Sequence, residues 1–273
     1  MIVFPNCKIN LGLNIISKRD DGYHNLETVF YPLPFYDVLE IIKSDNNKNE
    51  LFISGIEIEG EQQNNLCLKA YNLLKKDFPD LPYVKIYLQK NIPAGAGLGG
   101  GSADGAFMLK LLNEKFNLNL SEIQLLHYAL QLGSDCPFFI INKPCFAQQR
   151  GEVLEKIELD FSAYKILLIN PQIYINTSWA FTQINLSAPS LSVKEIIQKP
   201  VSEWKQHLKN DFESTVFEAH PSIKKIKDNL YEMGATYAAM SGSGSTVFGI
   251  FNKTDDISQH EFPENYFLKE LLL

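Results

Sequence analysis

The segment of this sequence with the clearest chemical character is the glycine-rich stretch at residues 91–105, which reads NIPAGAGLGGGSADG. It holds six of the sixteen glycines in the chain. Glycine at this density lets backbone N–H groups converge on a ligand that side chains would otherwise block. The composition therefore indicates an anion site, and phosphate is the anion that such loops most often bind.

Two well-known glycine-loop chemistries can be tested against this stretch. Gly95, Gly97 and Gly100 satisfy the spacing G-x-G-x-x-G. A dinucleotide-binding unit also needs a second strand that ends in an acidic residue about 20 positions later, and the sequence there, FNLNLSEIQLL, predicts a helix start instead. The phosphate-loop pattern needs a lysine after its last glycine, and here Gly101 and Ser102 follow. What remains is a phosphate cradle whose cation and base come from elsewhere in the chain.

Phosphoryl transfer requires a countercharge at the transferred group and a residue that takes the proton of the acceptor hydroxyl. Lys8 and Asp135 have the right side chains for these two roles. Lys8 belongs to a polar row that alternates with apolar residues over 7–15, so this row either faces water or lines a cleft, and the pattern alone favours water. Asp135 lies between a helix end and a hydrophobic run, where a carboxylate is more often a turn former or N-cap than a base.

Two further segments could carry chemistry or be plain structure. Residues 240–251, MSGSGSTVFGIF, predict either a flexible hairpin or a second anion cradle that runs into a strand. Tyr23 and His24 follow the turn signal Asp21-Gly22, and such a pair is usually ordinary cross-strand packing.

The elements that must position these residues follow from hydrophobic periodicity. Val84, Ile86 and Leu88 alternate with polar residues, so the first glycine stretch is expected between a strand and a helix, with Ser102 at the helix N-cap. Strands are also predicted at 7–15, 37–44, 51–59, 153–159 and 164–170. Helices are predicted at 66–77, from the capping box Ser121–Gln124 to Gly133, from the capping box Ser192–Glu195, and from Pro221 to Gly234. The organisation restarts near residue 160, which indicates two domains, 1–158 and 159–273.

Composition excludes several classes of protein. The formal net charge of −7 and the sequence pI of about 5.3 leave no global positive field to collect nucleic acid. The four cysteines form no CxxC pair, which argues against a zinc site and is typical of free thiols in a reducing compartment. The N-terminus lacks a signal-peptide pattern, and no stretch is apolar enough to span a membrane. We therefore expect a cytoplasmic protein with no nucleic-acid or membrane partner, and its oligomeric state stays open.

The residues PAGAGLGGGSA at 93–103 resemble the signature loop of the GHMP small-molecule kinases, which include galactokinase and the homoserine, mevalonate and phosphomevalonate kinases. Further segments, in order along the chain, are similar to one branch of this family: CKINLGLNI at 7–15, DGYHNLETVF at 21–30, GSDCPFFI at 133–140, NDFE at 210–213 and MSGSGSTVF at 240–248. The resemblance implies an α+β fold of two domains. The N-terminal domain would be like the second domain of ribosomal protein S5 and the C-terminal domain ferredoxin-like, with the active site in the cleft between them.

The resemblance also implies a reaction and its residues. ATP would phosphorylate the 2-hydroxyl of a cytidine diphosphate-linked methylerythritol, in the non-mevalonate route to isoprenoid precursors, with Mg²⁺ whose protein ligands the sequence does not identify. Asp135 would be the general base, and Lys8 the cation that keeps it ionised and orients the site. The ATP phosphates would be bound by the loop residues Pro93, Ala94, Gly95, Ala96, Gly97, Leu98, Gly99, Gly100, Gly101, Ser102 and Ala103.

The same resemblance implies a cytidine-binding site. Tyr23 would stack on the cytosine and His24 would hydrogen-bond it. Further substrate contacts would come from Asn10, Phe30, Phe181, Gly242, Ser243 and Gly244. Two alternatives remain: another kinase of the family, specific for homoserine or a mevalonate-type alcohol, and a non-catalytic RNA-binding protein of the S5-like fold, which the acidic composition disfavours.

The sequence departs from the family pattern at the end of the loop. Where many relatives have a second serine and then an asparagine, this chain has Ala103 and Asp104. A hydroxyl contact at residue 103 is therefore absent. Asp104 is expected either to place negative charge near the phosphates or to belong to the helix N-terminus, where a carboxylate is favourable. A second departure, Asn6-Cys7 in place of proline-alanine, removes no residue assigned to the chemistry.

Overall fold

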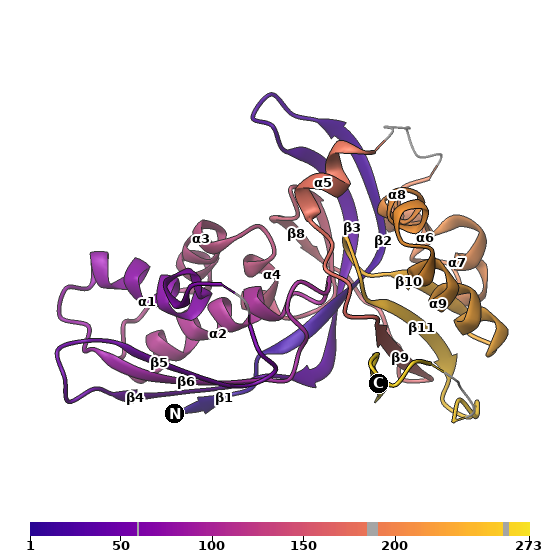
Figure 1. Cartoon of the computed structure of the whole chain (residues 1–273). Helices are drawn as coiled ribbons and strands as arrows, with labels where there is room; N and C mark the ends of the chain where they lie inside the picture. Colours follow the sequence, from indigo (N-terminus) through magenta and orange to yellow (C-terminus); the bar gives the residue numbers. More distant parts are fainter. Residues whose placement is uncertain (59, 185–190, 259–261) are drawn as a thin grey trace. The chain divides into compact units, whose positions relative to one another are not determined.

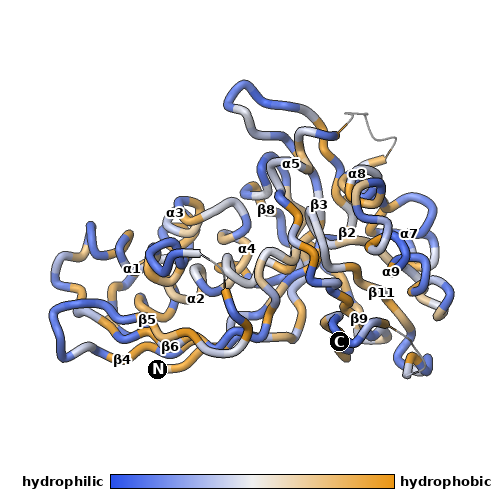
Figure 2. Tube along the Cα trace, in the orientation of Figure 1, coloured by the Kyte–Doolittle hydropathy of each residue, from blue (hydrophilic) through white to orange (hydrophobic). Residues whose placement is uncertain are grey.

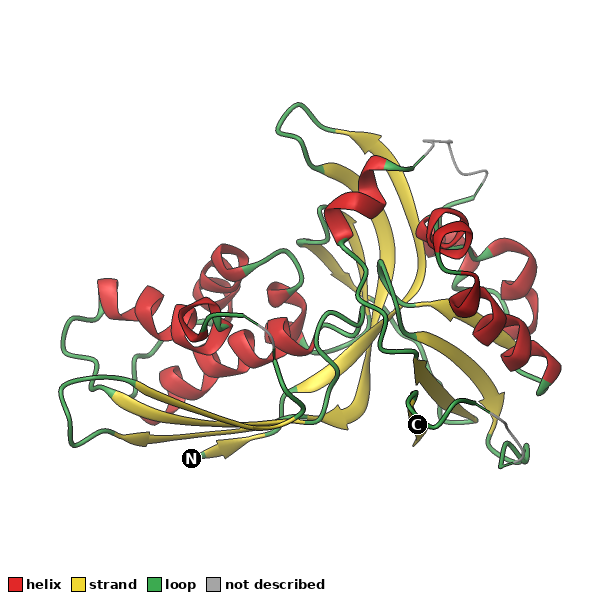
Figure 3. Cartoon of the chain, viewed as in Figure 1, coloured by secondary structure: helices red, strands yellow, loops and turns green. Residues whose placement is uncertain are grey.

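The structure is a computed structural model that describes residues 1–58, 60–184, 191–258 and 262–273. Helices and strands are mixed along the chain (Figure 1, Figure 3), which confirms the predicted α+β class. The chain forms two compact units, and each is assembled from separate segments. Unit 1 consists of Met1–Cys7, Phe35–Ala94 and Gly99–Lys143, and unit 2 of Lys8–Pro34, Gly95–Leu98 and Pro144–Leu273.

These units differ from the contiguous division expected at residues 158 and 159. Unit 2 takes in the N-terminal segment Lys8–Pro34 and the short segment Gly95–Leu98 in addition to the C-terminal half. The units describe packing, whereas the boundary near residue 158 concerns two stretches of sequence. That boundary stays a prediction.

Unit 1 contains a four-stranded sheet covered by helices. Its strands, in spatial order, are β1 (Ile2–Val3), β4 (Val38–Lys43), β6 (Val84–Lys90) and β5 (Glu50–Gly55). The alternation predicted for β6 is confirmed, since Val84, Ile86 and Leu88 are buried. The strand predicted at 51–59 is wrong in its length. It ends at Gly55, where the backbone has φ +84° and a Cβ would overlap the carbonyl oxygen of Lys90.

The helices of unit 1 lie together on one face of this sheet (Figure 1). They are the 3₁₀ turn η1 (Gln62–Asn64) and the α-helices α1 (Leu66–Asp77), α2 (Gly100–Lys115), α3 (Glu122–Leu132) and α4 (Cys136–Ile141). The predicted helix 66–77 and the capping box of Ser121 with Gln124 are confirmed. The prediction of Ser102 as an N-cap is wrong, because α2 begins at Gly100 and its N-cap is Gly99 in the left-handed conformation.

The first sheet of unit 2 contains the segment around Lys8. Its strands, in spatial order, are β2 (Asn6–Lys18), β3 (His24–Tyr36), β7 (Cys145–Gln149) and β8 (Val153–Lys156). The turn that joins β2 to β3 is hydrophilic (Figure 2) and is closed by a hydrogen bond from the Arg19 N–H to the Tyr23 carbonyl. The turn predicted at Asp21-Gly22 is therefore confirmed. β2 is buried on both faces from Asn6 to Ile15.

The second sheet of unit 2 is antiparallel throughout. Its strands, in spatial order, are β10 (Tyr237–Met240), β11 (Val247–Asn252), β9 (Tyr164–Asn170) and β12 (Phe267–Leu272). The helices of this unit are α5 (Thr177–Thr182), α6 (Val193–Ile196), α7 (Val201–His207), α8 (Phe212–Ala219) and α9 (Pro221–Glu232). The capping box at Ser192 and Glu195 and the proline start of α9 are confirmed.

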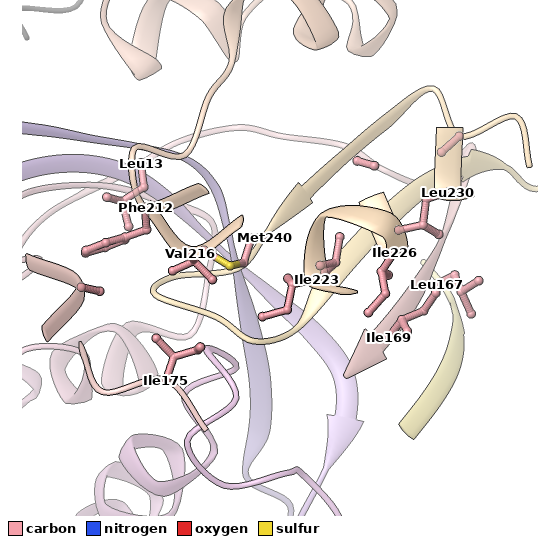
Figure 4. Close-up of a cluster of buried hydrophobic side chains, with 14 of the residues drawn as sticks. Leu13, Leu167, Ile169, Ile175, Phe212, Val216, Ile223, Ile226, Leu230 and Met240 are labelled. Carbon is pink, nitrogen blue, oxygen red and sulfur yellow. The ribbon is translucent and has the colours of Figure 1, made fainter. Parts of the chain in front are cut away.

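The core of this unit lies between α9 and the sheet (Figure 4). Ile223, Ile226 and Leu230 recur at helical spacing along α9, and they belong to one buried cluster with Leu167 and Ile169 of β9. Each such side chain contributes about 1.5–3 kcal/mol when it is fully buried. This core fixes the β10–β11 hairpin, whose connecting loop carries the second glycine-rich stretch.

Candidate active site

Lys8 and Asn10 lie side by side in β2, and both are buried. Lys8 Nζ donates hydrogen bonds to Asn10 Oδ1 at 2.5 Å and to the carbonyl oxygen of Gly97 at 3.0 Å. Asn10 Nδ2 donates to Thr28 Oγ1 on β3 at 3.1 Å. The interpretation in which this polar row faces water is therefore wrong. The row instead forms a buried polar network beside the tip of the first glycine stretch.

We name residues 91–99, between β6 and α2, the first glycine loop. Its tip, Gly95–Leu98, belongs to unit 2. The carbonyl oxygen of Gly97 accepts from Lys8 Nζ and also from Ser241 Oγ at 2.8 Å. Gly97 has φ +76°, and a Cβ there would overlap the Ser241 carbonyl oxygen. Only glycine allows the chain to approach so closely.

Residues 241–246, between β10 and β11, form the second glycine loop. The pairing of Met240 with Val247 makes this segment the connection of a hairpin, as one of the two predicted alternatives had it. Ser241 Oγ accepts from the backbone N–H of Asn10 at 3.2 Å, and the N–H of Thr246 donates to the Ala96 carbonyl at 3.2 Å. The tip of the first glycine loop, the second glycine loop and β2 therefore meet within unit 2.

The end of the first glycine loop presents the N-terminus of α2, within unit 1. Gly99 has φ +72°, and the helix starts at the next residue. The first N–H groups of a helix have no partner inside the helix and lie at the positive end of its dipole. A Cβ added at Gly101 would meet no atom within 4 Å. The backbone is thus open where an anion would approach it.

Asp104 does not take either of the places expected for it. Its side chain is 3% exposed, so it does not face a solvent-accessible phosphate site. Asp104 Oδ2 instead accepts a hydrogen bond from Lys90 Nζ at 2.7 Å. It is also the fifth residue of α2, beyond the first turn where a carboxylate favours the helix dipole.

Asp135 immediately precedes α4 in unit 1 and is half-buried. It occupies the N-cap position, yet its side chain makes no capping hydrogen bond. The thiol of the next residue, Cys136, is hydrogen-bonded to Ser102 in α2, and its pKa is raised to about 12 mainly by burial. This contact ties the start of α4, and with it Asp135, to the first turn of α2. Lys8 and Asp135 belong to different units.

Aromatic rings gather beside the β2–β3 turn of unit 2. The rings of His24 and Phe181 are stacked, with centroids 4.7 Å apart and planes 12° from parallel. Phe181 also packs edge-on against Phe212 at 4.9 Å. Tyr23 is 54% exposed, and one face of its ring is covered by the Arg150 guanidinium, whose Cζ lies 4.9 Å from the centroid. The structure therefore brings together residues 24 and 181, which are far apart in the sequence.

Burial, with a smaller effect of Lys18, lowers the pKa of His24. The imidazole is therefore neutral at neutral pH and has one N–H donor and one acceptor nitrogen. Phe30, in contrast, is only 2% exposed and lies beneath Lys8, whose Nζ is 5.2 Å from its ring centroid.

The second glycine loop contains Gly242, Ser243 and Gly244. Gly242 and Gly244 have positive φ values, and Ser243 Oγ lies 2.8 Å from Thr177 Oγ1. The residue that holds this loop is Asn210. Its Nδ2 donates to the carbonyl oxygens of Met240 at 2.7 Å and Gly242 at 2.8 Å.

Asn210 was not among the predicted site residues. It is the first residue of NDFE, a segment for which the sequence suggested no role. Asp211 Oδ2 accepts from the Ile15 N–H of β2 at 2.7 Å, and Glu213 Oε1 accepts from the Met240 N–H at 2.9 Å. This motif therefore fastens the loop and β2 together. The sequence signal that could have found it is the run of short amide and carboxylate side chains directly before a helix.

Unit 1 also has a surface groove of about 470 Å³ that the sequence did not indicate. It lies beside β5 and η1, and its lining includes Ile53, Gly55, Ile56, Asn64 and Asn65. Asn65 is the N-cap of α1, with its side chain accepting from the Cys67 N–H.

Within the residues that the structure describes, no three His, Cys, Asp or Glu side chains are grouped closely enough to hold a metal ion. No described helix is long and apolar enough to span a membrane.

Two family profiles match the chain: "GHMP kinases N terminal domain" over residues 65–143 and "GHMP kinases C terminal" over residues 192–261. Together with full-length relatives of more than 50% identity, these matches show that the chain belongs to the GHMP kinase family. It is thus an ATP-dependent small-molecule kinase, as the resemblance to this family had implied.

The names of similar proteins are more specific than the family profiles. The 4-diphosphocytidyl-2-C-methyl-D-erythritol kinase of Bacteroides fragilis (strain ATCC 25285) is 55% identical over 264 residues, which cover 96% of each chain. The protein of the same name from Bacteroides thetaiotaomicron is 53% identical and covers 98% of each chain. A crystal structure of 4-(cytidine 5'-diphospho)-2C-methyl-D-erythritol kinase superimposes with a TM-score of 0.78, at 29% identity, over 91% of this chain and 89% of that one.

A homoserine kinase from Cytophaga hutchinsonii has a TM-score of 0.66 at 14% identity, covering 91% of this chain and 85% of that chain. At this identity the likeness concerns the fold alone. The predicted fold of a two-domain GHMP kinase is confirmed.

Proposed function

We propose that this chain transfers the γ-phosphoryl group of ATP to the 2-hydroxyl of 4-diphosphocytidyl-2-C-methyl-D-erythritol. This reaction is a step of non-mevalonate isoprenoid precursor biosynthesis. The observation that carries the substrate assignment is the parallel stack of His24 on Phe181 beside the exposed ring of Tyr23. Flat rings grouped in this way suit a nucleobase. The relatives named above support the same substrate.

The ATP phosphates would lie against Pro93 to Ala103, which comprise most of the first glycine loop and the first residues of α2. This role is supported by the glycine backbone of the loop and by the open N-terminus of α2 at Gly101. The missing hydroxyl at Ala103 leaves Ser102 to make any side-chain contact in this turn. The Ser102 side chain is also bonded to Cys136, so its hydroxyl is already oriented.

The reaction would proceed by in-line attack on the γ-phosphorus. Asp135 takes the proton of the 2-hydroxyl, the oxygen forms the new P–O bond, and the bond to the β-phosphate oxygen breaks to release ADP. Lys8 supplies the positive charge that stabilises the ionised carboxylate and the negative charge of the transition state. The assignment is supported by the burial of Lys8 and by the position of Asp135 directly before α4.

Recognition of the cytosine would combine stacking and hydrogen bonds. Tyr23 has one ring face covered by Arg150, so a base would stack on the other face. A neutral His24 matches the edge of cytosine, which has both a donor and acceptors. Asn10, Phe30, Phe181, Gly242, Ser243 and Gly244 are the further substrate contacts that we propose.

Mg²⁺ would accompany the nucleotide. Magnesium in kinases takes most of its ligands from phosphate oxygens and water and few from protein. When bound, the ion would neutralise charge on the β- and γ-phosphates. We further propose that the enzyme acts in the cytoplasm.

Release of ADP in a coupled assay tests the proposal. ATP should be consumed with 4-diphosphocytidyl-2-C-methyl-D-erythritol and not with homoserine or mevalonate at equal concentration. Turnover of homoserine alone, or of mevalonate alone, would assign the chain to another branch of the family. Tight RNA binding at physiological salt without ATP binding would favour the non-enzymatic alternative, against which the net charge of −7 counts.

A further inference from the structure

Three charged side chains are buried together at the base of the first glycine loop, within unit 1. Lys90 is 2% exposed, Asp37 is fully buried and Asp104 is 3% exposed. Lys90 Nζ donates a hydrogen bond to Asp104 Oδ2 at 2.7 Å and another to Asp37 Oδ2. If both carboxyl groups were ionised, the cluster would hold one excess negative charge in the core. We call these three residues the neck cluster.

The neck cluster holds both ends of the loop. Asp37 Oδ1 accepts hydrogen bonds from the backbone N–H groups of Asn91 at 2.6 Å and Ile92 at 2.9 Å, the first two residues of the loop. Asp104 belongs to α2, which starts directly after the loop. Lys90, the last residue of β6, connects the two carboxyl groups. A Cβ added at Gly100 would lie only 2.9 Å from Ile92 Cγ2, so the two ends of the loop are packed together.

One carboxylate oxygen of the neck cluster is not hydrogen-bonded. Asp104 Oδ1 is buried and has no hydrogen-bond partner. An ionised carboxylate with an unsatisfied oxygen is costly in an apolar interior. A proton on Asp104 would remove the excess charge and turn this carboxyl into a donor toward Asp37, whose side chain faces it.

The groups that face Asp104 do not supply another compensating charge. They are Lys90 from β6, Asp37 from the segment between β3 and β4, and Cys67 from α1. The pKa of the Cys67 thiol is raised by burial and then by Asp104, so the thiol is neutral. Burial raises the pKa of Asp104 to about 7; Lys90 opposes this shift and Asp37 adds to it. For Lys90, burial lowers the pKa, but the two carboxyl groups outweigh it and the net direction is upward.

We propose that Asp37, Lys90 and Asp104 are positioning residues for the ATP-binding loop, and that the cluster must carry one proton to hold the loop in the form that binds ATP. The inference rests on the proposed kinase function. A protonated cluster is neutral and holds the loop ends together. When the proton leaves, the carboxylates of Asp37 and Asp104 repel each other at the base of the loop. They also add negative charge near the proposed phosphate site. ATP binding therefore weakens as the pH rises, without loss of any residue that touches ATP.

The direction in which the stability of the fold changes with pH follows from the raised pKa of Asp104. The folded state keeps the proton to about pH 7, whereas the unfolded chain releases it near the usual carboxyl value of about 4. The folded state thus binds more protons in this window, and its stability falls as the pH rises from about 4 to about 7. Asp104→Asn removes this dependence, because the amide is neutral in both states.

ATP affinity, measured by calorimetry from about pH 6 to about pH 9, tests the proposal. Over this range the dissociation constant for ATP should rise about 3- to 10-fold more in wild type than in Asp104→Asn. The ionisation of ATP itself affects both proteins equally, so the comparison removes its contribution. Asp228→Asn, at the exposed pair of Lys224 and Asp228, changes the net charge equally and should keep the wild-type profile. Equal pH profiles in wild type and Asp104→Asn would overturn the proposal.

A second measurement needs neither ATP nor substrate. Infrared difference spectra of wild type between the two ends of this pH range should show the loss of a carboxylic-acid C=O band, and Asp104→Asn should lack that change. An identical band change in the variant would assign the proton to another group and refute the inference. Failure of the ADP-release assay with an intact infrared result would instead reject the proposed function and leave the protonated cluster standing.

Discussion

The two glycine loops are fastened by different chemistry. The base of the first loop is held by the three buried charged groups of the neck cluster in unit 1. In the second loop, in unit 2, the side chains that bind residues 242, 245 and 246 are neutral amides, whereas the Glu213 carboxylate accepts from the Met240 N–H just before the loop. Asn210 donates to the carbonyl oxygen of Gly242, and Asn170 donates to the hydroxyls of Ser245 and Thr246 at 3.2 and 3.0 Å.

This difference predicts how each loop responds to change. Buried charges are expensive, so removing one partner of the neck cluster leaves an uncompensated charge, and its balance depends on pH. A buried amide has no ionisation to lose, so its removal costs only unsatisfied hydrogen bonds. The strength of hydrogen bonds made by carboxyl groups can therefore change with pH, whereas that of hydrogen bonds made by amides cannot. Substitutions at the two loops test this contrast.

The largest effect is expected at Lys8, which touches the tip of the first loop and is assigned to the chemistry. Lys8→Ala and Asp135→Ala should each lower kcat by about 1,000-fold, because each removes an electrostatic or proton-transfer contribution. ATP affinity should be largely kept in Lys8→Ala, since Ser241 Oγ still donates to the Gly97 carbonyl. Single-turnover rates and calorimetry separate the two quantities, with the exposed Lys224→Ala as control.

A rate near wild type in either variant would remove that residue from the mechanism. A large loss of ATP affinity in Lys8→Ala with an unchanged single-turnover rate would make Lys8 a loop anchor and not a catalytic residue.

The second-largest effect is expected at Lys90. Lys90→Met leaves Asp37 and Asp104 without their shared cation and should lower the free energy of unfolding by about 3–5 kcal/mol at neutral pH. The loss should shrink at low pH, where the carboxyl groups are protonated in folded and unfolded chains alike. Urea unfolding followed by circular dichroism measures it. Lys224→Met, at a pair with both side chains about half exposed, should cost no more than about 1 kcal/mol. Equal costs in the two variants would contradict the contrast between buried and exposed pairs.

Local signals in the sequence were enough for much of the fold. The helix 66–77 and the capping boxes at Ser121 and Ser192 were predicted because a cap and its periodic apolar residues lie within a few positions of each other. Ser102 was misplaced because a left-handed Gly99 caps α2 instead, and a glycine-rich loop offers several residues that could do this. The strand 51–59 was too long because Gly55 must pass close to the Lys90 carbonyl, a contact with a distant strand.

The candidate site was predictable only through family motifs. Alternation placed Lys8 and Asn10 on one face but favoured water, because the pattern cannot show that both faces of β2 are covered. The pairing of His24 with Phe181 joins positions that no local pattern connects. Asp104 was assigned to the loop or the helix end, since nothing nearby in sequence indicated that its partner Lys90 lies buried beneath it.

Gly97 of the first glycine loop and Gly101 in the first turn of α2 should respond in opposite ways. Gly97→Ala forces a left-handed alanine against the Ser241 carbonyl and should cost about 2–5 kcal/mol of stability, the sum of the conformational and overpacking terms. Gly101→Ala lies in a helix with open space around it and should stabilise the fold by about 1 kcal/mol. Its methyl group should nevertheless weaken ATP binding, because it enters the proposed phosphate site. Thermal unfolding and ATP calorimetry on both variants check this. Unchanged ATP affinity in Gly101→Ala would place the phosphates elsewhere.

The smallest effect, and the sharpest test of the neutral fastening, is expected at Asn210. Asn210→Ala removes the donor to the buried carbonyls of Met240 and Gly242 and should cost about 1–3 kcal/mol. Because neither the amide nor the carbonyls ionise, the cost measured by urea unfolding should be the same at about pH 6 and about pH 9, whereas the effect of Asp104→Asn changes with pH. The KM for the cytidine substrate should rise while ATP affinity stays near wild type. A cost that varied with pH as much as that of Asp104→Asn would mean that a charge, and not an amide, holds the second loop.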